Sequence, residues 1–375
     1  MNVLALNSGS STLKFGLYRV DPSHASRAEK LFADTISNPD LETAIAHIAQ
    51  RFRDSQMPAP AAIGHRIVHG GPTLRQHCRI DDAVIKQLES ATAFAPLHMP
   101  QSLSLIRFAR EHFPDVAQVA CFDTTFHAEL PDVARVLPIP KELQSEGIQR
   151  YGFHGLSCES IMRQLGGDAP ERIVIAHLGN GASVTAVKAG KSIDTSMGLT
   201  PTGGVVMSTR SGEIDPGVLL YLLREKKFDV AALEYLIEHR SGLLGISGVS
   251  SDMRRLHEAA AENAGARLAI QMFCYAVRKY VVAMGAALGG VDMLVFTGGI
   301  GENDARVRAQ ICDGLAWVGI SLDAARNESS RDPISASSSR CTVRVLPSQE
   351  EEQIARHTAA FCADDGSWCA NVGAS

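Results

Sequence analysis

The chain has 375 residues, of which 45% are hydrophobic and 21% charged, and its formal net charge is −5. A nucleic-acid-binding protein normally carries an excess of basic residues on one face, so this charge argues against a nucleic-acid partner. The length is well above the ~150 residues typical of one domain, and we therefore expect two domains.

The eight cysteines form no CxxC pair and show no regular spacing. This pattern favours reduced thiols in a cytoplasmic protein over a zinc site or a disulfide framework. The N-terminal run MNVLALNSGSS lacks the charged segment and long apolar core of a signal peptide. The apolar stretch LAIQMFCYAVRKYVVAMGAALGG is interrupted by Arg278 and Lys279, which predicts a buried helix, at a subunit interface in one reading, and no membrane span.

Two runs resemble each other: VLALNSGSSTLKFGLYRV at the start of the chain and IVIAHLGNGASVTAVKAG near its middle. Each has an apolar run, a Gly/Ser/Asn turn and a second run, and Gly9 and Ser11 match Gly181 and Ser183 at one offset. The pattern predicts two β-hairpins and a duplicated fold. Backbone N–H groups in such turns suit phosphate oxygens, so two facing hairpins would grip one polyphosphate. For either run alone, an ordinary edge hairpin is the alternative.

In the first half, AAIGHRIVHGG and VAQVACF are expected strands, and the second delivers Asp123 at its end. Residues 81–95 and 101–113 have helical periodicity. Strands that alternate with helices indicate an α/β fold. We place the domain boundary near residue 147, just before QRYGFHG.

The second half repeats this plan with larger insertions. Helical patterns cover residues 215–240 and 256–288, and the strand VDMLVF then leads into TGGIGEN and the helix DARVRAQICDGLA. A final strand, CTVRVLP, precedes the helix EEEQIARHTAAFC, which would return to the first domain, and a frayed tail. The expected domains are therefore residues 1–147, joined by 350–375, and residues 148–349.

Several segments carry candidate chemistry. TGGIGEN follows a strand and opens a helix, which places Gly298, Gly299 and Gly301 where backbone can approach a nucleotide or another phosphate ligand. It has neither Rossmann nor P-loop spacing. HRIVHGG and CFDTTFH place titratable groups at strand ends, where α/β proteins build their sites. Arg66 is a candidate anchor for a carboxylate or phosphate, with a surface ion pair as the alternative.

The histidines of these segments are expected to satisfy turn backbone. His65, His69 and His127 lie in no HxxEH or HExxH pattern, so a zinc site is not indicated.

An ordered set of motifs extends from residue 2 to about residue 358: NSGSSTLKF, GHRIVHGG, FDTTFH, YGFHG, HLGNG, DTSMGLTPTGG, STRSGEIDP, ISGVSSDMR and FTGGIGEN. Together they resemble the acetate kinase family, which belongs to the actin-like kinases. The resemblance implies a duplicated actin-like (ribonuclease H-like) α/β fold of two domains, with the active-site cleft between them. It agrees with the duplication inferred from the two hairpins.

The resemblance also implies the reaction and its participants. It implies reversible in-line transfer of a phosphoryl group from ATP to acetate, giving acetyl phosphate and ADP, in a cytoplasmic homodimer with no membrane partner. The metal would be Mg²⁺, with Mn²⁺ as a possible substitute. Asn7 and Glu350 would hold the metal, directly or through water, since Mg²⁺ takes few protein oxygens when phosphates and water complete its shell. Lys14 would contact a phosphate.

By the same resemblance, Arg66 and Arg210 would bracket the acyl carboxylate and the moving phosphoryl group, and His154 would donate to the same transition state. The remaining contacts are assigned as follows: the ATP phosphates to His177, Leu178, Gly179, Asn180 and Gly181; the adenosine to Asp252, Met253, Arg254, Gly299, Ile300, Gly301, Glu302 and Asn303; the acetate methyl to Val68, Leu97, Phe153 and Pro201. Ser208 replaces a glycine usual in the family, and Met253 stands where an aromatic residue is common.

The chemistry explains these residue types. A carboxylate that attacks the γ-phosphate is an anion approaching an anion, so the protein must neutralise charge on oxygens held in line. A small carboxylic acid with a pKa near ~4 to 5 is already ionised at neutral pH, so no general base is needed. We therefore expect Asp123 to position the metal's water or to orient Arg210.

Two alternatives remain. A propionate or butyrate kinase of the same family would differ little, because one methylene in an apolar pocket changes discrimination by only about 1 to 3 kcal/mol. An ATP-dependent binding protein on the same fold would need only the nucleotide loops. The presence of Arg66, Asp123, His154 and Arg210 argues against the binding protein.

Overall fold

The computed structural model describes residues 1–9, 12–21, 28–37, 43, 47, 48, 50 and 58–364. The chain forms two compact units. Unit 1 comprises Met1–Ala128, Gly155–Ser160 and Gln349–Ser375, and unit 2 comprises Glu129–His154 and Ile161–Ser348.

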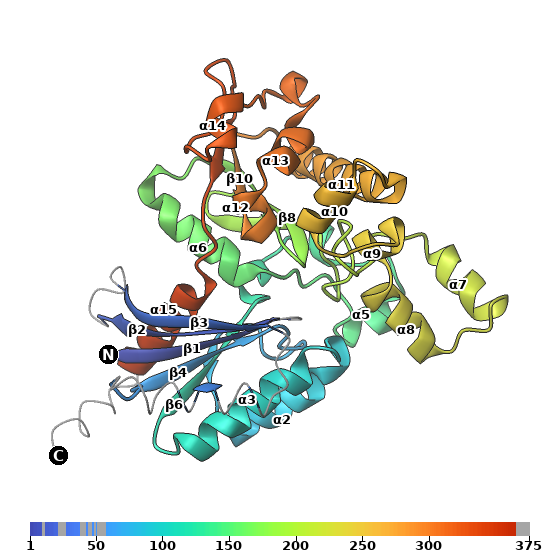
Figure 1. The fold of residues 1–375 in the computed structure, drawn as a ribbon. Helices are drawn as coiled ribbons and strands as arrows, with labels where there is room; N and C mark the ends of the chain where they lie inside the picture. Colours follow the sequence, from blue (N-terminus) through green and yellow to red (C-terminus); the bar gives the residue numbers. More distant parts are fainter. Residues whose placement is uncertain are drawn as a thin grey trace. The chain divides into compact units, whose positions relative to one another are not determined.

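Unit 1 contains a sheet of the order β3-β2-β1-β4-β6-β5 (Figure 1). Its strands are β1 (Asn2–Ser8), β2 (Thr12–Val20), β3 (Ala28–Ser37), β4 (Ala62–Ile67), β5 (Cys78–Arg79) and β6 (Ala117–Phe122). The first two form the expected antiparallel hairpin, while β1, β4 and β6 run parallel to one another. The helical segments are α2 (Asp82–Ser90), η1 (Ala91–Phe94), α3 (Met99–His112), η2 (Thr125–His127) and α15 (Glu350–Asp364).

Alternating side chains of β1 serve two cores. Val3 and Ala5 pack with residues of α15, whereas Leu4 and Leu6 pack in a separate cluster with Leu105 of α3. Because helices cover both faces of the sheet, the side chains on both faces of its central strands are mostly apolar. The sequences of these strands are therefore nearly continuous apolar runs, and this is why they could be predicted from the sequence. Helix α15 contacts β1, β2, β4 and β6, so this C-terminal helix belongs to unit 1.

Unit 2 contains a sheet of the order β11-β10-β7-β8-β9. Its strands are β7 (Arg172–Leu178), β8 (Ala182–Lys188), β9 (Lys191–Thr195), β10 (Met293–Thr297) and β11 (Thr342–Val345). Here too the first strand forms an antiparallel hairpin with the second and pairs in parallel, on its other side, with β10. The two sheets share this topology, which confirms the predicted duplication.

Unit 2 also contains the helical segments between residues 132 and 328. They are α4 (Asp132–Arg135), α5 (Lys141–Ser145), α6 (Gly155–Leu165, of which 155–160 belong to unit 1), η3 (Gly166–Asp168), α7 (Pro216–Arg224), α8 (Val230–His239), α9 (Gly242–Ser247), α10 (Met253–Ala259), α11 (Ala264–Leu288), α12 (Gly298–Asn303), α13 (Ala305–Cys312), η4 (Ala316–Val318) and α14 (Ala324–Glu328).

Three sequence expectations need adjustment. The single helical patterns at 215–240 and 256–288 are each two helices, α7 with α8 and α10 with α11. TGGIGEN, expected as a loop, forms the short helix α12. Gly9 begins its hairpin turn, whereas Gly181 ends its own, so their match at one offset is not a structural equivalence. Strands β1 and β7, and the starts of β2 and β8, match at an offset of 170 residues, whereas the expected match of the two glycines used an offset of 172.

Residues 129–154 belong to unit 2. Unit 2 therefore begins at Glu129, earlier in the chain than the domain boundary expected near residue 147. The reason is hydrogen bonding. Glu129 Oε2 accepts from Lys191 Nζ at 2.8 Å, and the Arg150 side chain donates both to Ala134 O (2.9 Å) and to Thr195 O (2.8 Å).

Helix α11 contains most of the long apolar stretch. One side of it is buried against the unit 2 sheet, while Leu268, Met272 and Tyr275 are exposed. Across residues 58–364 and the shorter described pieces before them, no helix has both the length and the apolar character needed to cross a membrane. The seven cysteines of the described residues are free thiols. The expected frayed tail lies outside the described residues.

The contact between β4 and α15 generates a stability prediction. A Cβ on Gly64 would lie 2.2 Å from Thr358 Oγ1 and 2.6 Å from Ile354 Cγ2, so α15 would have to move. Overpacking of this kind typically costs about 1 to 3 kcal/mol, and we expect Gly64→Ala to lower the free energy of unfolding by that amount. Gly167→Ala is the matched control because a Cβ there meets nothing within 4 Å. Urea unfolding followed by circular dichroism measures both, and equal midpoints for the two variants would contradict this account.

Candidate active site

Three neighbouring parallel strands of unit 1 end in polar residues. Asn7 lies near the end of β1, Arg66 near the end of β4, and Asp123 directly after β6. The strands pair in parallel, so their carboxyl ends meet at one edge of the sheet. That edge is where α/β proteins place their ligands.

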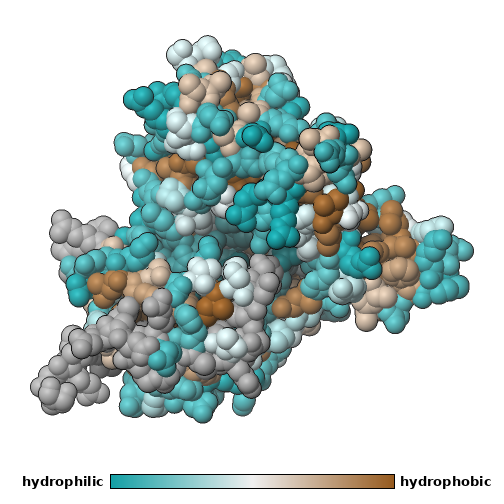
Figure 2. Space-filling view, in the orientation of Figure 1, coloured by the Kyte–Doolittle hydropathy of each residue, from teal (hydrophilic) through white to brown (hydrophobic). Residues whose placement is uncertain are grey.

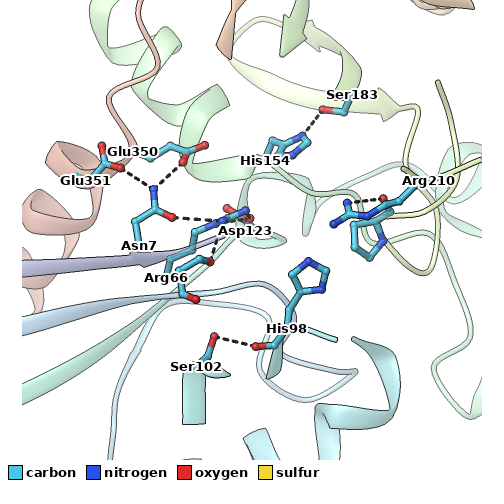
Figure 3. Close-up of polar contacts among 12 residues, drawn as sticks. Asn7, Arg66, His98, Ser102, Asp123, His154, Ser183, Arg210, Glu350 and Glu351 are labelled. Atoms are coloured by element: carbon cyan, nitrogen blue, oxygen red, sulfur yellow. Dashed lines mark hydrogen bonds and ion pairs between the residues drawn. The ribbon is translucent and has the colours of Figure 1, made fainter. Parts of the chain in front are cut away.

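The Arg66 guanidinium joins these strand ends (Figure 3). Its Nε donates to Asp123 Oδ2 at 2.8 Å, and its Nη1 donates to Ser8 O at 3.1 Å and to Asn7 Oδ1 at 3.3 Å. Burial would lower the pKa of Arg66, but the carboxylates of Asp123 and Glu350 raise it above its usual range. The cation is therefore fixed in orientation and fully charged.

Asp123 is completely buried, and its Oδ1 has no hydrogen-bond partner among the described residues. Burial raises the pKa of its carboxyl group to about 6, against the opposing influence of Arg66 and with a further increase from Glu350. We expected Asp123 to position a metal's water or to orient Arg210. Its hydrogen-bonded partner is Arg66, and Oδ1 is available to a water or ion.

Asn7 and Glu350, the expected metal ligands, lie together in unit 1. Asn7 Nδ2 donates to Glu350 Oε2 and to Glu351 Oε1, both at 2.8 Å (Figure 3). Glu351 was not singled out in the sequence, although it belongs to an acidic run at the start of α15. Lys14 pairs with Asn7 across the hairpin, and its Nζ lies 4.0 Å from Glu351 Oε1.

In unit 2, the carboxyl ends of the corresponding strands are followed by glycine-rich backbone, whereas in unit 1 they carry polar and charged side chains. Strands β7 and β10 pair in parallel up to His177 and Thr297, and the Gly-rich turn and α12 follow directly. A Cβ on Gly298, whose φ is +78°, would lie 2.8 Å from Leu178 O. Gly179 N donates to Gly181 O at 3.0 Å and closes the turn.

His154 and Arg210 both approach this turn. A Cβ on Gly181 would lie 3.2 Å from His154 Nε2, a tight contact, and 3.5 Å from Arg210 Nη1, an ordinary contact distance, so both groups lie directly beside this glycine. His154 Nδ1 hydrogen-bonds to Ser183 Oγ at 2.9 Å (Figure 3), and its ring stacks on His177 with centroids 4.2 Å apart. Arg210 is 9% exposed.

Ser208 accommodates its extra side chain by bonding to the same turn. Its backbone N donates to Asn180 O at 3.2 Å, and its Oγ donates to Asn180 Oδ1 at 3.3 Å. Ser208, which stands where the family usually has glycine, thus connects its own segment to the candidate phosphate turn at residues 179–181.

The residues assigned to adenosine have mixed environments. Asp252 caps α10 by accepting from Arg254 N at 2.8 Å and pairs with the exposed Arg254 guanidinium. Met253 is only 4% exposed, so its side chain belongs to the core. A nucleotide contact at this position depends on Asp252 and Arg254.

Helix α12 is held by its own polar residues and by a buried arginine that the sequence did not reveal. Glu302 Oε1 accepts from Gly298 N at 3.0 Å, and Asn303 Nδ2 donates to Gly299 O at 2.9 Å. Arg308 of α13 is fully buried and donates to the carbonyls of Gly301 and Glu302, each at 2.9 Å. Ile300, between them, is only partly buried.

The four residues expected around the acetate methyl divide between the units. Val68 (3% exposed) and Leu97 (42% exposed) belong to unit 1, and Phe153 and Pro201, both buried, belong to unit 2. Their assembly into one pocket stays a prediction.

Of the three histidines expected to satisfy turn backbone, His69 does so, whereas His65 bonds to a side chain. His69 Nδ1 accepts from Gly71 N at 2.8 Å, and His65 Nε2 bonds to Gln118 Oε1 at 2.9 Å. Burial lowers the pKa of His65 to about 4, which keeps its ring neutral. His127 is buried.

One cluster in unit 1, comprising His77, Glu159 and His357, has the composition of a metal site. Its ligand atoms lie within 4.8 Å of one another. However, His77 Nδ1 accepts from Phe122 N at 3.0 Å, so the ring proton is on Nε2, which faces Glu159. Burial raises the pKa of Glu159, but the hydrogen bond with His357 and the nearby His77, whose Nε2 lies 3.7 Å from Oε1, bring it down to about 2. We therefore interpret the cluster as a hydrogen-bonded tie between α6 and α15.

Comparisons with known proteins show the family of the chain. Residues 23–356 match the model of the acetokinase family. The acetate kinase of Methylocella silvestris is 40% identical (96% of this chain, 97% of the relative), and that of Clostridium botulinum strain Kyoto is 41% identical (96% and 98%).

Solved structures give the same result. A propionate kinase from Francisella tularensis superposes with a TM-score of 0.85 at 36% identity, covering 95% of this chain and 98% of that one. The acetate kinase of Porphyromonas gingivalis superposes with a TM-score of 0.84 at 35% identity, covering 96% and 99%.

The two sheets of like topology and the superposition on solved acetate and propionate kinases define a kinase with a duplicated α/β fold. Within that class, the chain belongs to the acetokinase family.

The raised pKa of Asp123 leads to a prediction about pH and metal. Because the carboxyl group is neutral below about pH 6, kcat/KM of the wild type should fall as the pH is lowered through that value, and Asp123→Asn should lack this limb. A charge-positioning role and a general-base role both give that limb, so metal dependence separates them. If Asp123 holds charge in place, higher Mg²⁺ or Mn²⁺ should restore part of the activity of Asp123→Asn. Absence of restoration at any metal concentration would favour proton transfer.

Proposed function

We propose that the protein is an ATP:acetate phosphotransferase that transfers the γ-phosphoryl group of ATP reversibly and in line to acetate. The observation that carries the proposal is full-length similarity to acetate kinases at about 40% identity, together with the four expected catalytic residues, each held by hydrogen bonds within its own unit. These residues are Arg66, Asp123, His154 and Arg210.

The electrostatic demand of the reaction accounts for the unit 1 edge. Phosphoryl transfer needs positioning and charge neutralisation more than covalent help from the protein. Arg66 has two anchored edges, at Asp123 and at Ser8 O, so its charge needs no reorganisation when the substrates bind. Asp123 acts through Arg66, as a positioning residue, because the acetate nucleophile is already ionised.

In unit 2, His154 and Arg210 supply donors beside the glycine turn. With the Ser183 hydroxyl donating to His154 Nδ1, the ring proton is on Nε2, the atom near Gly181. Both groups can then donate to oxygens of the transferred phosphoryl group. The backbone N–H groups of the turn bind the phosphates of ATP.

Kinases of this family use ATP with a divalent metal, and the unit 1 residues fit one. Glu350 Oε2 and Glu351 Oε1 each lie 2.8 Å from Asn7 Nδ2, Asn7 Oδ1 is a further hard oxygen, and Asp123 Oδ1 is a buried acceptor without a donor among the described residues. Asn7 and Glu350 would hold Mg²⁺, or Mn²⁺ in its place. When bound, the metal supplies positive charge to the phosphate oxygens.

Propionate kinase activity is the second candidate, because one of the closely superposed structures is a propionate kinase. The acetate assignment has more support, since the relatives at 40% and 41% identity are acetate kinases. A butyrate kinase has no such support among these comparisons.

We also propose that the protein is a cytoplasmic homodimer. Figure 2 shows hydrophobic side chains gathered over α7 and α8 of unit 2. Val218, Leu220 and Tyr221 of α7 and Tyr235 of α8 are exposed, as is Tyr275 of α11 at 61%. Solitary exposed apolar residues are ordinary, but a contiguous group marks an association surface.

The first prediction is enzymatic. The purified protein should convert acetate and ATP to acetyl phosphate and ADP only when a divalent metal is present. Formate, propionate and butyrate should react more slowly, with propionate within about 10- to 200-fold of acetate because one methylene is worth about 1 to 3 kcal/mol. Hydroxamate trapping measures each acyl phosphate. A folded, metal-replete preparation that forms none of them would refute the function.

The second prediction concerns assembly. Multi-angle light scattering should give twice the 40.2 kDa chain mass. Replacing exposed Tyr221 and Tyr275 by Lys should shift the mass toward that of one chain, since each change places a charge on the proposed apolar surface. Lys substitution at exposed Val133 is the control, because that residue lies on α4 and not on the helices α7, α8 and α11 of the proposed surface. A monomeric wild type would contradict the dimer.

A further inference from the structure

The carboxylate of Glu238 is placed against the candidate catalytic residue Arg210 by unit 2 alone. Glu238 lies in the last turn of α8, and its side chain is 12% exposed. Its Oε2 lies 3.3 Å from Arg210 Nε, and its Oε1 accepts from Thr202 Oγ1. None of the sequence motifs included this residue.

The backbone around Arg210 is bound to the same turn of α8. Thr209 Oγ1 donates to Glu238 O at 2.7 Å, and Ser211 N donates to Ile237 O at 3.0 Å. The residues on either side of Arg210 are therefore both attached to the end of this helix. The position of Glu238 relative to Arg210 is fixed by main chain as well as by side chains.

A second pair of contacts sets the plane of the guanidinium. Arg210 Nη1 donates to Pro201 O at 3.2 Å (Figure 3), and the next residue, Thr202, bonds to Glu238. The guanidinium is oriented by two unlike contacts, an ion pair at Nε with Glu238 Oε2, which does not have the alignment of a hydrogen bond, and a hydrogen bond from Nη1 to Pro201 O. In that orientation Nη1 also lies beside Gly181, where a Cβ would be 3.5 Å away.

A carboxylate suits this position for a physical reason. Arg210 is 9% exposed and keeps its charge, since a guanidinium does not deprotonate in proteins. A buried cation without a partner anion would turn toward water or draw water into the site. Glu238 supplies that anion on the Nε side, away from the Pro201 and Gly181 contacts of Nη1.

We propose that Glu238 is a positioning residue for phosphoryl transfer, which holds the Arg210 guanidinium by its Nε edge and directs Nη1 to the glycine turn. The inference rests on the proposed function, because it assumes that Arg210 meets the transferred phosphoryl group. Glu238 itself exchanges no proton and touches no substrate. A purely structural tie between α8 and residues 202–211 is the alternative.

The kinetic test compares Glu238→Gln with Glu234→Gln, a change of the same kind one turn earlier on α8. Gln keeps the shape of the side chain and an acceptor for Thr202 but removes the charge. We expect kcat for acetyl phosphate formation to fall at least 10-fold in Glu238→Gln, with KM for ATP within about 3-fold of the wild type. Glu238→Asp, which keeps the charge, should recover part of kcat. Glu234→Gln should match the wild type.

Chemical rescue provides a readout that a structural tie would not change. Arg210→Ala should lose roughly 10²- to 10⁴-fold in kcat. Free guanidinium ion should restore part of this loss because the Glu238 carboxylate and Pro201 O still form its binding place. In the double variant Arg210→Ala/Glu238→Gln the restoration should be at least 10-fold weaker. Equal restoration in both would overturn the proposal, as would a kcat of Glu238→Gln within 2-fold of the wild type.

An NMR measurement makes the test independent of activity and of the proposed function. The Arg210 Nε–H signal, assigned by its loss in Arg210→Lys, should exchange slowly with solvent and shift in Glu238→Gln. An unshifted signal would overturn the proposal even in an active enzyme. If Glu238→Gln fails to fold, Thr202→Val removes only the hydroxyl that holds Oε1 and should reduce kcat in the same direction. A wild type that makes no acyl phosphate but shows the shifted signal would refute the function and leave the Arg210 geometry supported.

Discussion

The structure depends on holding two guanidinium groups out of water beside carboxylates. Arg66 is bound to Asp123 in unit 1, and Arg210 lies against Glu238 in unit 2. A reaction between two anions needs such cations, and their effect on the reacting oxygens is larger where water is excluded. A buried charge without a partner is costly, so each arginine requires an anion of its own. Both carboxylates then follow from the need to keep cations in place.

The duplicated sheet explains why the two units solve this problem differently. In each, a hairpin and two parallel strands end at one edge. In unit 1 this edge carries the side chains of Asn7, Arg66 and Asp123, whereas in unit 2 it carries the glycine turn and α12. Side chains suit a metal and a small carboxylate, and exposed backbone N–H groups suit phosphates. The same sheet topology thus provides two kinds of candidate binding site.

The sequence predicted the features that depend on local pattern: both hairpins, the strands that end near Arg66 and at Asp123, and the glycine segments. It could not predict partners that are distant in the chain. Nothing near residue 7 points to Glu351, and nothing near Arg210 indicates that an ordinary surface-type glutamate of α8 faces it. Such pairs arise from the packing of elements, and periodicity along one element carries no information about it.

His154 shows how the site departs from local preference. Its φ of +60° lies in the left-handed region, which costs a residue other than glycine about 1 kcal/mol or more. Stacking on His177 and the bond to Ser183 hold the ring in place despite this cost. The same bond fixes the ring's tautomer when the Ser183 hydroxyl is the donor, so the proton is on the nitrogen nearest Gly181. The strained backbone and the ordered ring therefore have one result, a donor directed at the turn that we propose as the phosphate site.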